Sequence, residues 1–296
     1  MKRSSVIIAL EICAIAALFV SWSFQRPNSR QVTVGNASEH FIRWVDFEAS
    51  YEALEAALEL DIASQETDTP VSWIDLIALA AAKNGNNFSG FKRRELEGYV
   101  QQLQEGKSLE ALTENLRYFP YYQEAYGAAL GGLVGHFEIE VDDETAPGGK
   151  RFAPQYGLKA FLPIAKGYPY SDFDDFGVSR TYGFTRRHLG HDFMGATGTP
   201  IIAVEGGVVE ALGWNQYGGW RIGIRSLDGR RYYYYAHLRQ NFPFNKSLEE
   251  GSIVQPGDVI GYMGHTGYST TENVNNMEQP HLHFGMQLIF DESQKE

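Results

Sequence analysis

Cysteine is almost absent from this sequence of 296 residues, and positive charge is in deficit. The one cysteine is Cys13, so no intramolecular disulfide can form and a metal site would have to use His and carboxylate ligands. The 37 Asp and Glu residues outnumber the 25 Lys and Arg residues, which gives a formal net charge of -12. A molecule this acidic meets a phosphate backbone unfavourably, so we expect no nucleic-acid partner.

A long apolar run occurs at the N-terminus, within a sequence that is otherwise of globular composition, with 43% hydrophobic residues. Residues Ser4 to Phe24 are apolar apart from Glu11 and a few serines, and they follow two cations. This length matches the roughly 20 residues that cross a bilayer. We therefore expect residues 1–29 to form a cytoplasmic tip and a transmembrane anchor, with the C-terminal domain outside the cytoplasm. The alternative is a cleaved signal peptide and secretion, although the segment lacks a clear small-x-small cleavage pattern.

Residues 30–147 are predicted to form a helical domain after a short polar linker. Apolar residues recur at helical spacing in four stretches. Ser72 has the spacing of a capping box with Asp75, and Asn84-Gly85 is typical of a helix C-cap. The four stretches contain Phe47, Tyr51, Leu54 and Leu58; then Ile74, Ile77 and Ala81; then Leu96, Val100 and Leu103; then Leu109, Leu112 and Leu116, followed by an aromatic cluster from Tyr118 to Tyr126.

The apolar stripes of this region are typical of a small helical bundle that packs against itself. The alternative is a cap or regulatory domain over the C-terminal domain, with an envelope protein as its partner. The region has no residues of the kind that a reaction needs, so its role stays open.

Residues 148–296 are predicted to form a mostly antiparallel β domain, which makes the whole chain an α+β protein. The boundary is placed where the acidic residues near Asp142 give way to Ala-Pro-Gly-Gly-Lys150. Asp228-Gly229 lies between two β-type runs and is typical of a hairpin turn. The expected strands are short runs separated by glycine, at 201–204, 207–211, 220–225, 232–236, 259–262 and 283–289.

Six of the eight histidines fall between His188 and His283. On a strand, alternate side chains share a face, so His281 and His283 point the same way about 6.6 Å apart. Two imidazoles then converge on one site, where one can bind a metal and the other can stand beside it.

His188 and Asp192 need a bend before they can share a metal. In an extended chain they would lie about 13 Å apart, and Gly190 between them permits a bend. With His283 they would give three ligands of the kinds that zinc accepts, leaving the fourth tetrahedral position for water. An open position of this kind is typical of a catalytic zinc. His237 and His281 would flank the water, one as general base and one stabilising the oxyanion, and the sequence does not assign the two roles.

Each motif alone has a simpler interpretation. An H-x-H on a strand is a weak signal for metal, and His and Asp are common in glycine-rich loops. His237 after a tyrosine-rich strand would ordinarily be a half-buried sheet residue. The order and combination of the motifs favour the metal site.

Residues 187 to 285 resemble the lysostaphin-like (LytM-type) zinc metallopeptidases, a family of peptidoglycan endopeptidases. The matching text is His188-Leu-Gly-His-Asp192-Phe, Gly198-Thr-Pro-Ile, Ala203-Val-Glu-Gly-Gly-Val208-Val, Tyr235-Ala-His237-Leu, Val254-Gln-Pro-Gly-Asp-Val-Ile-Gly261, Gly264-His-Thr-Gly267 and His281-Leu-His283-Phe. The match covers about a third of the chain.

The resemblance implies a β-sheet groove with one zinc ion per chain, held by His188, Asp192 and His283, and catalytic help from His237 and His281. The implied substrates are the stem or bridge peptides that cross-link peptidoglycan, cut at bonds involving glycine or D-alanine.

Three features depart from the family pattern. The link between Gly267 and His281 is long and polar, which puts the substrate specificity in doubt. Gly285 stands where relatives often have Glu. His191 stands beside Asp192 where an apolar residue is common, and a strand would turn it to the opposite face.

Two other functions compete with the hydrolase. A catalytically silent lysostaphin-like module could bind or activate an envelope partner, although the complete set of ligands argues against this. A lipoyl-type carrier, suggested by Val254-Gln-Pro-Gly-Asp-Val-Ile-Gly261, would need a lysine at a hairpin tip, and none is found there.

Overall fold

The computed structural model describes residues 47–289 except 174 and 182–184. Among these residues, no helix combines the length and the apolar character needed to span a bilayer. The segment Ser4 to Phe24, in which we predict an anchor, lies outside the described residues.

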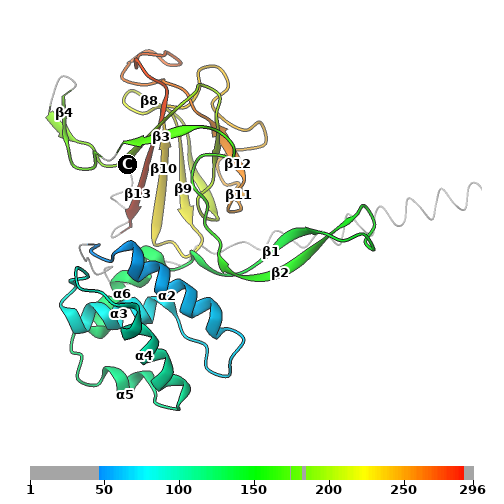
Figure 1. Cartoon of the computed structure of the whole chain (residues 1–296). Helices are drawn as coiled ribbons and strands as arrows, with labels where there is room; N and C mark the ends of the chain where they lie inside the picture. The colour runs from blue at the N-terminus through cyan, green and yellow to red at the C-terminus, as the bar shows by residue number, and fades with distance from the viewer. Residues whose placement is uncertain (1–46, 174, 182–184, 290–296) are drawn as a thin grey trace, which may run out of the picture. The chain divides into compact units, whose positions relative to one another are not determined.

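Helices occupy the first part of the described chain (Figure 1). They share a core built around Leu76, Ile77, Leu96 and Tyr126, all of which are fully buried. The helices are α2 (Tyr51–Ser64), α3 (Trp73–Asn84), α4 (Arg93–Gln104), α5 (Leu109–Thr113) and α6 (Phe119–Leu130).

The ends of α3 lie where the sequence predicts them. The hydroxyl of Ser72 accepts a hydrogen bond from the backbone N–H of Ile74 at 3.2 Å, and Gly85 adopts the left-handed conformation at φ 61°. A side chain at Gly85 would be strained in this conformation, which is why glycine ends the helix.

Helix α2 differs from the predicted apolar stripe. Tyr51 is 71% exposed, and the fully or almost fully buried residues of the apolar face are Ala53, Ala56 and Ala57. Leu54 and Leu58 of the predicted stripe are half-buried and pack against the helical core, whereas Phe47 lies before the start of the helix. The prediction is therefore confirmed for the two leucines and wrong for Tyr51. A fifth helix, α6, occupies the aromatic cluster that follows Leu116.

Strands β1 (Val134–Asp142) and β2 (Lys150–Leu158) form an antiparallel hairpin of nine residue pairs. Its turn is stabilised by Asp143, whose carboxylate accepts from the backbone N–H of Thr145 at 2.9 Å. The composition change that we used as a domain boundary between residues 147 and 148 therefore lies in a hairpin turn.

The remaining strands build an antiparallel sheet with the order β11-β8-β9-β10-β13-β6-β3 (Figure 1). Two smaller pairs, β12 with β7 and β4 with β5, lie outside it. The strands are β3 (Tyr170–Phe173), β4 (Ser179–Thr181), β5 (Thr185–Arg187), β6 (His191–Gly195), β7 (Pro200–Ile202), β8 (Gly207–Asn215), β9 (Gly219–Ser226), β10 (Arg231–Ala236), β11 (Ile253–Val254), β12 (Val259–Tyr262) and β13 (His281–Leu288).

All six predicted strands have a counterpart in this list, and the predicted hairpin joins β9 to β10. Gly229 lies in its turn at φ 75°, and Arg225 pairs with Tyr232 across it. The sheet core contains Ile201, Ile222, Ile224 and Leu282, which are all fully buried. The expectation of helices followed by a mostly antiparallel β domain is confirmed for the described residues.

A buried ion pair lies at one end of β10. The guanidinium of Arg231 is fully buried and donates from Nε and Nη2 to the two carboxylate oxygens of Glu205, each at 2.9 Å. Its Nη1 donates to the carbonyl of Ala128 in α6 at 2.6 Å. A buried charge pair of this kind depends on complete hydrogen bonding, which this arrangement supplies.

Candidate metal centre

Two of the predicted ligands face each other across neighbouring strands. Asp192 in β6 and His283 in β13 are a register pair, so their side chains leave the same face of the sheet at the same level. The Nδ1 atom of His283 lies 3.0 Å from Oδ1 of Asp192. Sheet register therefore brings together residues that are 91 positions apart in the sequence.

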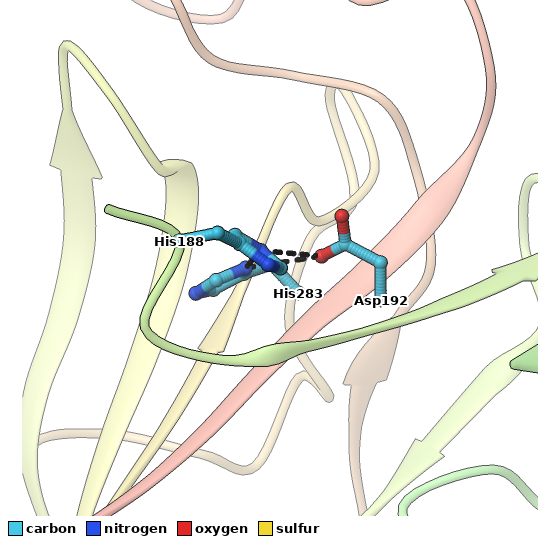
Figure 2. A group of neighbouring side chains, drawn as sticks. All are labelled: His188, Asp192 and His283. Carbon is cyan, nitrogen blue, oxygen red and sulfur yellow. Dashed lines mark hydrogen bonds and ion pairs between the residues drawn. The ribbon is translucent and has the colours of Figure 1, made fainter. Parts of the chain in front are cut away.

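His188 reaches the same place from the segment between β5 and β6. Its Nε2 atom lies 3.1 Å from Oδ1 of Asp192 and 2.8 Å from Nδ1 of His283. Figure 2 shows the two imidazoles and the carboxylate oxygen converging on one point.

Gly190 is required here for a reason that differs from our prediction. Its backbone is not in the left-handed region, so the bend itself does not demand glycine. A Cβ at this position would lie 2.5 Å from Cε1 and 2.6 Å from Nε2 of His283. The absent side chain therefore makes room for the imidazole of a predicted ligand.

The three donor atoms fit a zinc ion. Zinc bonds of about 2.0 Å in a tetrahedral site separate the donor atoms by about 3.3 Å, close to the 2.8 to 3.1 Å found here. The donor set of two imidazoles and one carboxylate is one that zinc accepts. His188, Asp192 and His283 could thus hold one divalent ion with small shifts.

Burial and hydrogen bonding tune these ligands. Burial alone would raise the pKa of Asp192, but hydrogen bonds from His188 and His283 lower it far below its ordinary value. Burial lowers the pKa of His283, against the opposing effect of Asp192. A deprotonated carboxylate and neutral imidazoles are the forms that bind a metal.

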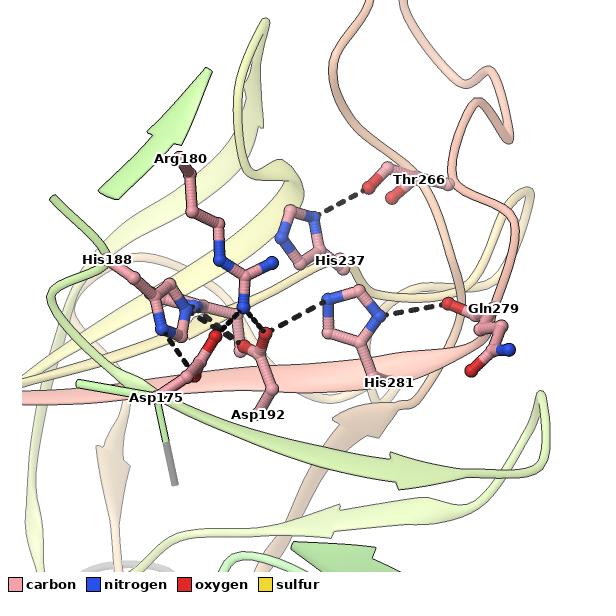
Figure 3. Close-up of polar contacts among 9 residues, drawn as sticks. Asp175, Arg180, His188, Asp192, His237, Thr266, Gln279 and His281 are labelled. Atoms are coloured by element: carbon pink, nitrogen blue, oxygen red, sulfur yellow. Dashed lines mark hydrogen bonds and ion pairs between the residues drawn. The ribbon is translucent and has the colours of Figure 1, made fainter. Parts of the chain in front are cut away.

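Asp175 and Arg180 belong to this site and were missed by the sequence analysis. Nδ1 of His188 lies 2.8 Å from Oδ1 of Asp175, and neither atom has another hydrogen-bond partner among the described residues. Arg180 forms an ion pair with Asp175 and donates to Oδ2 of Asp192 at 2.9 Å (Figure 3). Asp175 therefore orients His188 so that Nε2 faces the metal position, as outer carboxylates commonly do for metal-binding histidines.

His237 follows β10 and points toward the site. Its backbone adopts φ 61°, an uncommon conformation for a residue with a side chain. Its Nδ1 lies 2.8 Å from the carbonyl oxygen of Thr266, and a Cβ on Gly267 would lie 3.0 Å from that nitrogen. The motif Gly264-His-Thr-Gly267 thus holds His237 in place.

The two predicted catalytic histidines share one tautomer. A carbonyl oxygen only accepts hydrogen bonds, so Nδ1 of His237 carries the hydrogen that Thr266 receives. Nδ1 of His281 likewise donates to the carbonyl of Gln279 at 2.9 Å. In the neutral form of each ring, Nε2 would carry a free lone pair, and Nε2 of His281 lies 4.0 Å from Oδ2 of Asp192 (Figure 3).

The protonation state of His237 is biased toward neutral. Burial, followed by the charges of His281 and His283, lowers the pKa of His237 well below its ordinary value. The rings of His237 and His281 have centroids 4.8 Å apart. Two neighbouring imidazoles that both accept protons at Nε2 can take and return protons beside the metal position.

The structure therefore brings all five predicted residues to one small cavity of about 60 Å³. His188, Asp192 and His283 form one group, and His237 and His281 stand next to them. His191 stays apart, because its Nε2 lies 3.6 Å from Asp172 and its ring packs against Phe193. The individual roles of the five remain predictions from the sequence.

Known proteins match the same part of the chain. Residues 186–294 match Peptidase family M23. An L-Ala--D-Glu endopeptidase of Bacillus subtilis is 43% identical over 131 residues, which cover 44% of this chain and 38% of that protein. Lysostaphin of Staphylococcus staphylolyticus is 35% identical over 120 residues, which cover 40% of this chain and 21% of the relative. The chain thus spans well under half of the length of these relatives.

One solved structure extends the likeness beyond the metal site. A protein assigned as a glycyl-glycine endopeptidase (lytM) of Ruminococcus gnavus matches with 25% identity and a TM-score of 0.50, covering 84% of this chain and 83% of the other. The resemblance to LytM-type and lysostaphin-type peptidases is confirmed by these matches. Residues 186–294 of this chain are a domain of peptidase family M23.

Proposed function

We propose that this chain is a zinc-dependent endopeptidase that hydrolyses peptide cross-links of bacterial peptidoglycan. The observation that carries the proposal is the convergence of His188, Asp192 and His283, with donor atoms 2.8 to 3.1 Å apart. Three protein ligands leave a tetrahedral ion one open position, which is the arrangement of catalytic rather than structural zinc.

One zinc ion per chain would be held by Nε2 of His188, Oδ1 of Asp192 and Nδ1 of His283. The chemistry supplied by bound zinc is Lewis-acid activation of water and of the peptide carbonyl. Asp175 fixes the orientation of His188, and the register of β6 and β13 fixes that of the other two ligands.

His237 and His281 supply the proton transfers in this proposal. Nε2 of one ring accepts the proton of the attacking water and later returns it to the leaving amine. The other ring, once protonated, donates a hydrogen bond to the oxygen that becomes negative. Hydrogen bonds from Nδ1 to the carbonyl oxygens of Thr266 and Gln279 restrain the two rings. Each Nε2 is therefore already oriented before the substrate binds.

The relatives support this substrate class. They include an L-Ala--D-Glu endopeptidase and lysostaphin. We therefore propose stem or bridge peptides of peptidoglycan as substrates of this chain.

We further propose that residues 1–29 anchor the chain in the cell membrane with the peptidase domain outside the cytoplasm. The basis is the apolar run from Ser4 to Phe24 behind two cations. We also propose that residues 30–147 and 148–296 are separate domains. The helical domain, residues 30–147, would bind an envelope protein.

Digestion of purified peptidoglycan tests the function. Sacculi with glycine bridges and sacculi with direct cross-links are incubated with the zinc-loaded protein, and the released fragments are identified by mass spectrometry. New amino termini at defined peptide bonds are expected. A catalytically silent module would instead sediment with the sacculi and release no fragments, which would overturn the proposal.

A further inference from the structure

A pair of arginines lies directly across the short hairpin of β4 and β5. Arg180 and Arg186 are a register pair, and both line the cavity that holds the predicted ligands. Like charges directly opposite each other destabilise a strand pair. In a chain with a net charge of -12, two cations placed together at the mouth of a cavity indicate a place for anions.

The first arginine of the pair, Arg180, already forms ion pairs with carboxylates of the protein. Arg180 is paired with Asp175 and with Oδ2 of Asp192. Two carboxylates surround one guanidinium, so Arg180 offers little charge to a ligand. It belongs to the framework of the metal site.

The second arginine, Arg186, has no such partners among the described residues. Among the residues that the structure describes, no carboxylate forms an ion pair with Arg186, and its buried Nε has no hydrogen-bond acceptor. A buried donor without an acceptor is costly and uncommon. Its guanidinium lies over the ring of Tyr268 with 5.1 Å to the centroid, which restrains the cation without satisfying its hydrogen bonds.

Tyr268 connects Arg186 to the predicted catalytic residues. The ring of Tyr268 stacks on His237 with centroids 5.9 Å apart and planes at 23°. The ring of Tyr268 therefore contacts both His237 and Arg186. It also lines a second cavity of about 290 Å³, which is bordered by Met277 and Glu278 of the long loop before β13.

Another cavity next to His283, of about 310 Å³, has a different lining. Its side chains, which include Leu189, Tyr232, Tyr234 and Met286, contain no carboxylate, lysine or arginine. A substrate carboxylate in that cavity would meet no guanidinium, whereas one that lay past Tyr268 would meet Arg186.

We propose that Arg186 is a specificity-determining residue that binds a free carboxylate of the substrate peptide next to the cleaved bond. The inference rests on the proposed function and adds to it a substrate class, acidic stem peptides rather than neutral glycine bridges. A guanidinium donates two parallel hydrogen bonds to a carboxylate. The buried Nε of Arg186 is one of the donors available for such a pair.

The probe is a matched pair of synthetic peptides. One is L-alanyl-γ-D-glutamyl-L-lysyl-D-alanine, which keeps the free α-carboxylate of its D-glutamyl residue, and the other carries a carboxamide at that position. The two peptides have nearly the same shape and differ in charge and in one oxygen acceptor, which becomes an NH2 donor in the carboxamide. Since hydrogen bonds to charged groups contribute about 1.5 to 3 kcal/mol, the unaltered protein is expected to prefer the acidic peptide by about 10- to 100-fold in kcat/KM.

Three variants assign the preference to one side chain. In Arg186→Gln the ratio of the two kcat/KM values is expected to fall to within about threefold of one, and Arg186→Lys is expected to keep part of the preference. Arg187→Gln is the matched control, because Arg187 is the exposed neighbour on β5 and lines neither cavity. It removes the same charge and is expected to keep the full ratio.

Binding separates the inference from the proposed activity. The Kd of each fluorescently labelled peptide is measured in the His281→Ala background, with and without Arg186→Gln, and the same ratios are expected. An unaltered protein that cuts or binds both peptides equally would overturn the role of Arg186 while leaving the peptidase intact. A protein that cuts neither peptide and releases nothing from sacculi would overturn the proposed function and this inference together.

Discussion

Asp192 and His283 are opposite each other in the ladder of β6 and β13, with 3.0 Å between Oδ1 and Nδ1. The strand register fixes this distance, so the two ligands are placed before any metal binds. His188, held from behind by Asp175, completes the group. Two residues of the site thus come from paired strands of the sheet, and the third, His188, comes from the segment between β5 and β6.

Replacement of His283 by alanine is expected to remove metal and activity together. The substitution leaves two ligands, too few for stable binding of zinc by this donor set. Metal content by mass spectrometry of the purified protein is expected to fall from about one zinc per chain to near zero, with turnover at background. Normal zinc content in His283→Ala would remove this residue from the site.

His281→Ala is expected to keep zinc and lose most turnover. Its Nε2 lies 4.0 Å from Asp192 and is outside the group of ligands, so the metal is retained. Loss of a proton-transferring side chain typically lowers the rate about 10²- to 10⁴-fold. The measurements are zinc content and kcat, with His237→Ala in parallel. A near-normal rate in His281→Ala would end its catalytic assignment.

Asp175→Ala tests the positioning of His188. The substitution removes the carboxylate 2.8 Å from Nδ1 of His188, and loss of such an outer partner typically costs about 10- to 100-fold in metal affinity or activity. Zinc affinity is measured by competition with a chelator. Asp172→Ala is the control, because Asp172 is an exposed carboxylate whose nearest ion-pair partner is His191. Equal zinc affinities for the two variants would contradict the role of Asp175.

Gly190→Ala is expected to disturb the site more than the fold. The new methyl would lie 2.5 Å from the ring of His283, and this ring would have to move away from Asp192. We expect lower zinc affinity with a nearly unchanged far-ultraviolet circular dichroism spectrum. Gly90→Ala is the control, because Gly90 also lies outside the left-handed region and no atom lies within 4 Å of its new methyl. Full zinc affinity in Gly190→Ala would show that the contact is relieved elsewhere.

Glu205→Ala is expected to lower stability strongly. It leaves the fully buried guanidinium of Arg231 with the partly exposed Asp228 as its remaining carboxylate partner, and breaking a buried pair costs about 3 to 5 kcal/mol. Glu140→Ala breaks an exposed pair with Lys150 and is expected to cost about 1 kcal/mol or less. Urea unfolding of the two variants compares the effects. Similar midpoints would contradict the proposed importance of the buried pair.

The sequence pointed to the residues that the structure brings together, His188, Asp192 and His283, because the motifs that contain them are local. His281 and His283 alternate on one strand, and the glycine-rich motifs around His188 and His237 are short and contiguous. The alternation of side chains along a strand, together with the resemblance to lysostaphin-like peptidases, then predicts that these residues lie close together in space. The turn at Asp228-Gly229 and the ends of α3 were predictable for the same reason.

Asp175, Arg180 and Arg186 were not predictable in this way. Asp175 lies in an acidic stretch in which nothing distinguishes it from Asp172, and its role depends on the path of the chain between β3 and β5. Arg186 becomes informative only when its cross-strand neighbour and Tyr268 are seen beside it. The buried alanines of α2 were missed, and Tyr51 was wrongly placed on the buried face, because alanines carry a weaker apolar signal than tyrosine and leucine.

Zinc titration of the stripped protein tests the central claim most directly. The protein is freed of metal with a chelator, zinc is returned in fractions of an equivalent, and new amino termini released from peptidoglycan are counted at each step. Activity is expected to rise linearly and to stop rising at one zinc per chain. Full activity in the metal-free protein, or no activity at any zinc concentration, would contradict the account.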